Sequence, residues 1–392
     1  MLPLKGVRVL DLTAVNGFAA MELADYGAEV IKVERPKGGD AVRFYPPFKD
    51  DVSLYHAFMD RGKKSITLDL KTEEGKEILK ELVKTADVLI ENFKVGTMEK
   101  MGLGYDVLSQ INPKLVYGAL TSYGSTGPEK DYIAYDVAVQ AKAGVMDITG
   151  FAEGKPTKVG AYIGDHYSCT YLCAAIGMAL YHARATGQGQ KVETSMFEAL
   201  VSILEDKFAI CDCEGCATRT GNAHPSINPY DVVRCKDGYV ALGISTDDQW
   251  SKFCIEFGKP EWVEDPKYAN NAQRGLHYFG DLRDKLENYL VENFTKAEID
   301  DKCAKIKVPA AGCNTIEEAI NQEQIKVRDM IVTVNDQRIG ELKTVGKIIK
   351  FHDENKDIDF KSAPILGQNN DEIYGEILSP EKIAELKEKK II

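Results

Sequence analysis

The chain has 392 residues, enough for two domains, and its 44% hydrophobic and 28% charged residues are ordinary for a globular enzyme. Its formal net charge of −12 argues against nucleic-acid binding, which needs clustered lysine and arginine, but leaves room for a local basic pocket. The N-terminus enters a strand-like stretch directly, and no apolar run approaches the roughly 18 residues of a membrane span. We therefore expect a cytoplasmic protein that binds neither membrane nor nucleic acid.

Strand-like and helix-like segments alternate in the first third of the chain. Strands are expected at residues 7–12, 28–34, 65–70, 87–91 and 115–120, with helices at 18–26 and 73–85. The second helix carries four apolar residues on one face, which are Ile78, Leu79, Leu82 and Val83. Because strands separated by helices form a mostly parallel sheet with helices on its faces, we predict an α/β fold.

The remaining segments indicate a second, smaller domain. A long helix is expected at 165–185, then a strand at 190–195, a helix at 197–206 and a loop or linker at 211–229. A short strand at 239–242 and helices to about residue 320 follow. Strands are expected again at 330–334 and 345–351, and a charged helix near 380–389. We interpret its lysine-rich end, residues 387–390, as a solvated helix end rather than a binding patch.

Several familiar motifs of nucleotide and hydrolase enzymes are missing. The turn after the first strand has one glycine, Gly17, where a dinucleotide fingerprint needs three, so an NAD or FAD enzyme is not expected. Neither a Gly-x-x-x-x-Gly-Lys-Ser/Thr loop nor a Gly-x-Ser-x-Gly elbow occurs.

The nine cysteines fit a reducing compartment better than a disulfide framework. Cys211, Cys213 and Cys216 are close together in sequence, but the nearest downstream histidine is His224, and a zinc site needs a fourth ligand. We favour small, partly buried side chains near a helix end and predict no bound metal.

Asp165 follows Gly164 at the start of the predicted long helix and allows two interpretations. Aspartate is a favoured N-cap because its carboxylate accepts hydrogen bonds from free backbone N–H groups. The same position suits a nucleophilic carboxylate, whose charged form the positive end of a helix stabilises. The local pattern favours the cap but does not decide between them.

A series of short motifs follows in order through the first 200 residues. They are Val9–Thr13, Gly27–Pro36, Lys63–Lys71, Glu91–Phe93 with Gly96, Met101–Leu103, Ser122–Gly124 with Thr126–Pro128, Tyr135–Asp136, Gln140–Ala141 and Gly164–Asp165. In this order and spacing the chain resembles the class III CoA-transferases, the family of the formyl-CoA:oxalate and carnitine CoA-transferases and the related α-methylacyl-CoA racemases.

The resemblance implies an architecture. It implies a large α/β domain with a Rossmann-like parallel sheet, a smaller α+β domain and a homodimer whose chains interlock. The expected division is residues 1–200 for the large domain, 201–225 for a linker, 226–320 for the small domain, 321–345 for a second linker and 346–392 for a return to the large domain.

The resemblance also implies a mechanism and site residues. Asp165 matches the catalytic nucleophile, which attacks an acyl-CoA thioester and passes through a mixed anhydride and an aspartyl-CoA thioester before CoA moves to an incoming carboxylic acid. The positions that match the CoA pocket or the reacting thioester are Val15, Asn16, Arg35, Leu68, Asn92, Phe93, Lys100, Met101, Tyr135 and Asp136. Acyl-CoA and a carboxylic acid are the expected substrates, with no permanently bound cofactor.

Two positions and one segment depart from relatives within the family. Lys100 replaces a frequent arginine, and Ile133 stands where one subgroup has lysine. Residues 243–250 lack the glycine run of the formyl-CoA:oxalate enzymes, so oxalate is not the expected acceptor.

The family contains a second activity, and we weigh it as the alternative function. The family's racemases carry a histidine immediately before the aspartate that matches Asp136. This chain has Tyr135 there, a poor base near neutrality because its reference pKa is about 10. We therefore favour transferase over racemase. A non-catalytic acyl-CoA-binding protein on the same scaffold would have no need of Asp165.

Overall fold

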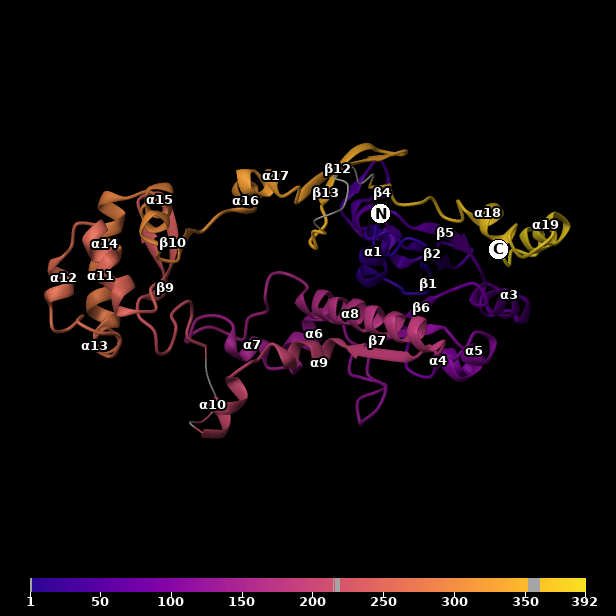
Figure 1. Cartoon of the computed structure of the whole chain (residues 1–392), viewed down its shortest axis with the longest axis horizontal. Helices are drawn as coiled ribbons and strands as arrows, with labels where there is room; N and C mark the ends of the chain where they lie inside the picture. The colour runs from indigo at the N-terminus through magenta and orange to yellow at the C-terminus, as the bar shows by residue number, and fades with distance from the viewer. Residues whose placement is uncertain (1, 214, 216–218, 352–359) are drawn as a thin grey trace. The chain divides into compact units, whose positions relative to one another are not determined.

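The computed structural model describes residues 2–213, 215, 219–351 and 360–392 (Figure 1). The chain divides into two compact units. The first, here called the sheet unit, comprises residues 1–145, 158–206 and 326–392, and the second, the small unit, comprises 146–157 and 207–325. Within the described residues no helix is both long and apolar enough to cross a bilayer.

A six-stranded parallel sheet forms the centre of the sheet unit. Its strands are β1 (Arg8–Asp11), β2 (Glu29–Glu34), β5 (Lys64–Thr67), β6 (Val88–Glu91), β7 (Val116–Thr121) and β8 (Lys191–Ser195). They lie in the order β5-β2-β1-β6-β7-β8, and in the register Leu10 stands opposite Ile31 on β2 and Leu89 on β6. Successive crossovers therefore run in opposite directions on the two sides of the β1–β6 boundary. The predicted α/β fold with a large parallel sheet is confirmed.

Alternating side chains of these strands face two separate cores, as the two-residue period of a strand requires. Val9, Val88 and Val116 pack on one face against α1 (Phe18–Asp25) and α8 (Ile163–Thr186). Their neighbours Leu10, Leu89 and Tyr117 pack on the other face against α3 (Glu73–Val83), α5 (Tyr105–Ile111), α18 (Asn370–Tyr374) and α19 (Pro380–Glu388). The sheet is thus covered on both faces.

The edge strand β5 is covered by residues from the far end of the sequence. The N–H groups of Ser65 and Thr67 donate to the side-chain oxygens of Asn369 and Asn370, at 3.0 and 2.8 Å. The hydroxyl of Tyr374 donates to the carbonyl of Thr67 at 2.6 Å. Side chains of α18 and the turn before it therefore satisfy backbone groups that an edge strand usually exposes.

The sheet unit contains further short elements. They are η1 (Ala41–Phe44), β3 (Phe48–Lys49), β4 (Val52–Ser53), α2 (Leu54–Met59), α4 (Thr97–Lys100), α6 (Asp136–Lys142), α9 (Met196–Ser202), β12 (Ile331–Asp336) and β13 (Gly340–Val345). Two helices, α7 (Val145–Ile148) and α17 (Glu323–Val327), span the boundaries between the units.

The strand predicted at 345–351 is wrong. The segment that pairs with β12 is β13, which ends at Val345, and residues 346–351 form no strand. The short turn before Gly340 sets the register, so the partner of β12 is the segment that immediately follows this turn. The apolar residues of 345–351 suggested a strand but do not determine the pairing.

The small unit is an α+β arrangement. Its antiparallel sheet has the order β11-β10-β9, with β9 (Tyr230–Cys235), β10 (Gly238–Gly243) and β11 (Ala310–Gly312). Its helices are α10 (Lys207–Cys213), α11 (Asp247–Glu256), α12 (Glu261–Glu264), α13 (Asn271–Leu276), η2 (Tyr278–Leu282), α14 (Arg283–Asn293), α15 (Lys296–Ile306) and α16 (Ile316–Ile320). Trp250, Phe253 and Leu286 lie in its core, each at most 1% exposed.

Candidate active site

Two cavities lie at the carboxyl edge of the sheet, one between the ends of β1 and β6, where the winding direction changes, and the other beside the ends of β1, β2 and β5. Such a switch point opens a crevice in a parallel sheet and is the usual place for a ligand. The first cavity, of about 280 Å³, is lined by Val15, Asn16, Asn92, Phe93, Tyr135 and Asp165 among the predicted site residues. The second, of about 1070 Å³, is lined by Arg35, Leu68, Phe93 and Met101 among them. Ala14 and Phe93 line both cavities, which are therefore neighbours.

Asp165 lies in the first turn of α8 and does not cap it. The helix begins two residues earlier, at Ile163, and its N-cap residue Tyr162 makes no side-chain capping bond. The carboxylate instead lines the first cavity and accepts a hydrogen bond from Asn16 Nδ2 at 3.0 Å. Burial, together with the negative charge of Asp136, raises its pKa to about 6. The carboxylate is thus mostly ionised at neutral pH and more basic than an ordinary aspartate.

Asp136 lies one layer behind the cavity surface. It is the first residue of α6, it is 4% exposed, and it lines neither cavity. Its carboxylate accepts hydrogen bonds from the backbone N–H of Gly164 at 2.7 Å and from Gln140 Nε2 at 2.6 Å. A Cβ at position 164 would lie 3.0 Å from Asp136 Oδ1, so glycine permits this close approach. The pair fixes the start of α8 and hence the position of Asp165.

The loop after β1 presents Asn16 to Asp165 in a strained backbone conformation. Val15 has φ of +67°, which is unfavourable for a β-branched residue. Its N–H donates to the carboxylate of Asp40 at 3.1 Å. Asn92, at the end of β6, makes two hydrogen bonds of 2.8 Å with the backbone N–H and C=O of Ala14. Asp40 and Asn92 thereby hold the loop in a shape that the local sequence does not favour.

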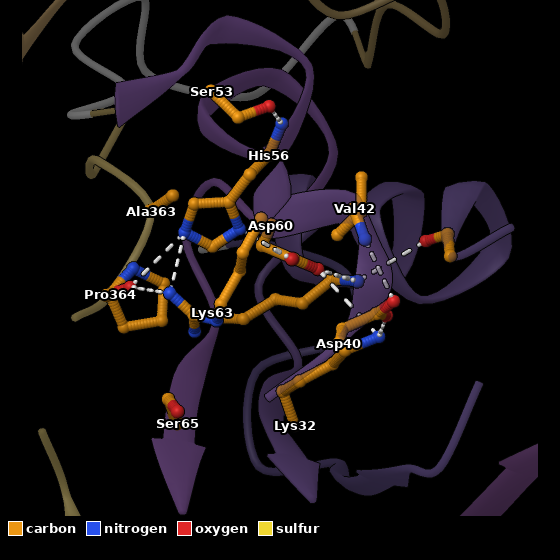
Figure 2. A network of polar contacts seen from close by, with 12 residues as sticks. Lys32, Asp40, Val42, Ser53, His56, Asp60, Lys63, Ser65, Ala363 and Pro364 are labelled. Carbon is orange, nitrogen blue, oxygen red and sulfur yellow. Dashed lines mark hydrogen bonds and ion pairs between the residues drawn. The ribbon is translucent and has the colours of Figure 1, made fainter. Parts of the chain in front are cut away.

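A buried network of charged side chains supports this loop, and Figure 2 shows Lys32, Asp40, His56, Asp60 and Lys63 grouped together. Lys32 Nζ donates to the carbonyl of Thr13 at 2.6 Å and pairs with Asp40 at 2.8 Å. Lys63 Nζ pairs with Asp60 at 2.9 Å. Burial alone would raise the pKa of Asp60, but Lys63 and Lys32 outweigh it and hold that pKa well below its ordinary value.

Two lysines of the C-terminal helix end line the second cavity. Lys387 and Lys390 border it together with Arg35, Lys37 and Lys71. Lys387 pairs with Asp371 at 2.5 Å. The other four have no ion pair with a carboxylate in the part of the chain that the structure describes, and they converge on one cavity of an otherwise acidic protein. Lys387 and Lys390 are exposed, as expected of a solvated helix end, and they also border this cavity.

Two predictions concern residues that do not join these cavities. Lys100, the last residue of α4, is exposed and lines neither cavity, whereas its neighbour Met101 lines the second. Cys211 and Cys213 are exposed free thiols, and Cys216 lies outside the described residues. Among the described residues, no group of three His, Cys, Asp or Glu side chains has an arrangement that could hold a metal ion.

A doubly wound sheet binds its ligand at the switch point, and cations around a cavity there suit a phosphorylated small molecule. The neighbouring carboxylate of raised pKa indicates an enzyme. The family model described as CoA-transferase family III matches residues 4–370. The chain belongs to this family, as the motif series predicted, and is a CoA-transferase.

Individual relatives agree over most of the chain. It is 38% identical over 341 residues to the succinate–glutarate CoA-transferase of Agrobacterium fabrum, covering 84% of each chain. It is 35% identical over 386 residues to the acetyl-CoA:oxalate CoA-transferase of Acetobacter aceti, covering 97% of each. The crystal structure of a CAIB/BAIF family protein from Brucella suis matches with a TM-score of 0.82 and 33% identity, over 95% of this chain and 99% of that one.

Proposed function

We propose that this enzyme transfers coenzyme A from an acyl-CoA thioester to a free carboxylic acid through a covalent intermediate on Asp165. The observation that carries the proposal is the position of the Asp165 carboxylate, which lines the first cavity instead of capping its helix. A pKa of about 6 leaves it roughly nine-tenths ionised at pH 7 while keeping it a better nucleophile than an ordinary aspartate.

The proposed chemistry conserves one activated acyl bond at every step. The Asp165 carboxylate attacks the thioester carbonyl and the C–S bond breaks. CoA departs as a thiolate, and a mixed anhydride forms between Asp165 and the donor acyl group. The thiolate attacks the aspartyl carbonyl, releases the donor carboxylate and forms an aspartyl-CoA thioester. The acceptor carboxylate attacks that thioester and expels the thiolate, which then attacks the acceptor carbonyl of the new anhydride. Asp165 returns to a carboxylate, and no ATP is needed.

We place the nucleotide portion of CoA in the second cavity and the thioester in the first. The support for this orientation is the set of four cations around the second cavity that pair with no carboxylate among the described residues, since the nucleotide carries the phosphates of CoA. Ala14 and Phe93 line both cavities, so the pantetheine arm would pass beside them. Tyr135, 70% exposed in the lining of the first cavity, is placed to donate a hydrogen bond near the reacting carbonyl.

A short dicarboxylic acid is the acceptor that we propose to test first. The two relatives compared above are named for glutarate and oxalate, which are both dicarboxylic acids. The first cavity also has Lys94 and Lys130 in its lining, so a cation is available for a second carboxylate. Oxalate itself stays a predicted non-substrate, because residues 243–250 lack the glycine run.

We also propose a cytoplasmic homodimer with interlocked chains. The exposed side of α8 carries Tyr167, Tyr171, Met178 and Tyr181, which are 44%, 47%, 68% and 79% exposed. Their spacing places them on one face of the helix, and large apolar faces of this kind usually bind another surface. The eight cysteines that the structure describes as free thiols suit a reducing compartment. Light scattering of the purified protein gives the oligomeric state.

Trapping of the intermediate tests the proposed mechanism. The enzyme is incubated with succinyl-CoA alone, treated with borohydride and digested, and the peptide containing Asp165 is examined by mass spectrometry. Reduction of an aspartyl thioester to the alcohol at Asp165 is expected. Exchange between succinyl-CoA and glutarate that persists in Asp165→Ala would exclude the mechanism. Exchange of α-protons into deuterated solvent without CoA transfer would favour the racemase alternative.

A further inference from the structure

The amide of Asn16 lies between two side chains of one helix. Asn16 Nδ2 donates to Asp165 Oδ1 at 3.0 Å, and Asn16 Oδ1 accepts from Cys169 Sγ at 3.1 Å. Asp165 and Cys169 are four residues apart on α8, so both face the loop after β1. An amide is a donor at one end and an acceptor at the other, so a rotation by half a turn would set its oxygen against the carboxylate.

We propose that Cys169 is a positioning residue, whose thiol holds the Asn16 amide in the orientation that presents its NH₂ group to Asp165. The inference rests on the proposed role of Asp165 as nucleophile. It goes beyond that role because it assigns a task to a side chain that touches neither cavity.

The surroundings of Cys169 keep its thiol protonated and therefore able to donate. The residue is 1% exposed, and burial raises the pKa of its thiol to about 12. The charged groups around it are Asp165 on the same helix, Glu22 on α1 and Lys63. The two carboxylates raise this pKa and Lys63 lowers it only in part, so the thiol stays S–H throughout the working pH range.

The chemistry explains why a second contact is needed. A carboxylate attracts the NH₂ end of Asn16 by its charge, but the anhydride and the thioester of the proposed mechanism carry no such charge on Asp165. In those states the carboxylate no longer selects the orientation of the amide, whereas the Cys169 thiol is unchanged. The backbone bond from Asn16 N–H to the Ala14 carbonyl, at 2.7 Å, fixes the main chain but not the rotation of the side chain.

The helix supplies a matched control at Cys173, one turn further along. Its thiol donates to the carbonyl of Ala19 at 3.4 Å and also hydrogen-bonds the Glu22 carboxylate, so its polar partners differ from those of Cys169. Cys173→Ala therefore removes a thiol from the same helix and from the same core, without touching the amide.

The test measures kcat and KM of CoA transfer from succinyl-CoA to glutarate in the full-length variants. Cys169→Ala is expected to lower kcat about fivefold, the worth of one hydrogen bond, with KM for succinyl-CoA unchanged. The acid limb of its kcat/KM profile should not move, because in the free enzyme the charge of Asp165 still selects the orientation of the amide. Cys169→Ser, which retains a donor, should restore most of the loss, and Cys173→Ala should stay within about twofold of the wild type.

A double-mutant cycle makes the inference refutable even if Cys169→Ala is partly unstable. In an Asn16→Ala background, Cys169→Ala should cost less than about twofold, since no amide is left to orient. The inference is overturned if the full loss persists in that background, or if Cys169→Ala and Cys173→Ala behave alike. Asp165→Ala distinguishes a failure of the proposed function from a failure of the proposed role of Cys169. Retained exchange in this variant removes the proposed function and this inference together, whereas lost exchange with a silent Cys169→Ala removes this inference alone.

Discussion

The Asp136 carboxylate accepts a hydrogen bond from the backbone N–H of Gly164 at 2.7 Å, and so a second negative charge stands directly behind Asp165. This charge adds to burial in raising the pKa of Asp165 to about 6. The contact therefore has two effects, since it fixes the start of α8 and makes the neighbouring carboxylate more basic.

The first prediction concerns the pH dependence of catalysis. Because Asp165 acts as a carboxylate, kcat/KM should rise with pH through about 6. Asp136→Asn removes the charge but keeps an acceptor for Gly164, so the acid limb should move to lower pH by less than one unit, since burial remains. Glu91, whose pKa burial raises to about 7, titrates in the same range, and Glu91→Gln serves as the control. An acid limb that shifts in Glu91→Gln but not in Asp136→Asn would contradict the assignment.

The second prediction concerns the effect of the Asp165 carboxylate on the free energy of unfolding. A carboxyl group whose pKa is higher in the folded than in the unfolded chain binds protons more tightly when folded, so its contribution to stability decreases as pH rises from about 4 to 6. Asp165→Asn should therefore abolish CoA transfer and raise the free energy of unfolding by about 2 kcal/mol at pH 8. The difference should nearly vanish at pH 4. Urea unfolding at both pH values measures it, and equal stabilities at pH 8 would refute the raised pKa.

The third prediction concerns the lysines of the second cavity. Lys390→Gln should raise KM for succinyl-CoA about fivefold, equivalent to about 1 kcal/mol, with kcat unchanged, because a phosphate loses a cation in both ground and transition state. The matched control is Lys389→Gln, since Lys389 pairs with Glu74 at 2.7 Å and lies outside the cavity lining. With a succinyl-pantetheine substrate, which has no nucleotide, the two variants should be equal. A Lys390 effect that persists with this substrate would show that the lysine does not bind the nucleotide.

The fourth prediction concerns the loop that carries Asn16. Asn92→Ala removes both hydrogen bonds to Ala14, so the strained conformation at Val15 should relax. Asn16 should then lose its hydrogen bond to Asp165. We expect kcat to fall at least tenfold and the free energy of unfolding to fall by only about 1–2 kcal/mol. Kinetics and urea unfolding of the same samples compare the two losses. Unchanged kcat would mean that Asn92 does not hold the loop for catalysis.

Much of the sheet unit followed from periodicity in the sequence. The buried strands and the amphipathic helix at 73–85 were predicted within a few residues, because their apolar patterns reflect burial on one or two faces. The start of α8 was predicted at residue 165, two residues late. With the helix starting at Ile163, Asp165 lies inside the first turn and is not the N-cap residue.

The supporting contacts of the site could not be predicted in this way. Lys32 lies within a buried strand, and its charge is tolerated only because Asp40 and the Thr13 carbonyl meet it in three dimensions. Lys390 reaches the cavity of Arg35 from the far end of the sequence, and no local pattern reports such a contact. Positions matched to a family can be named from the sequence, but the network that holds them depends on the fold.

The cover over β5 has a consequence for how the chain matures. Ser65 and its partner Asn369 are separated by 304 positions, so a ribosome exposes the edge of β5 long before the residues that cover it are made. During that interval the nascent sheet has an open side that can pair with another chain. Protection of this edge against aggregation thus depends on residues synthesised 304 positions later.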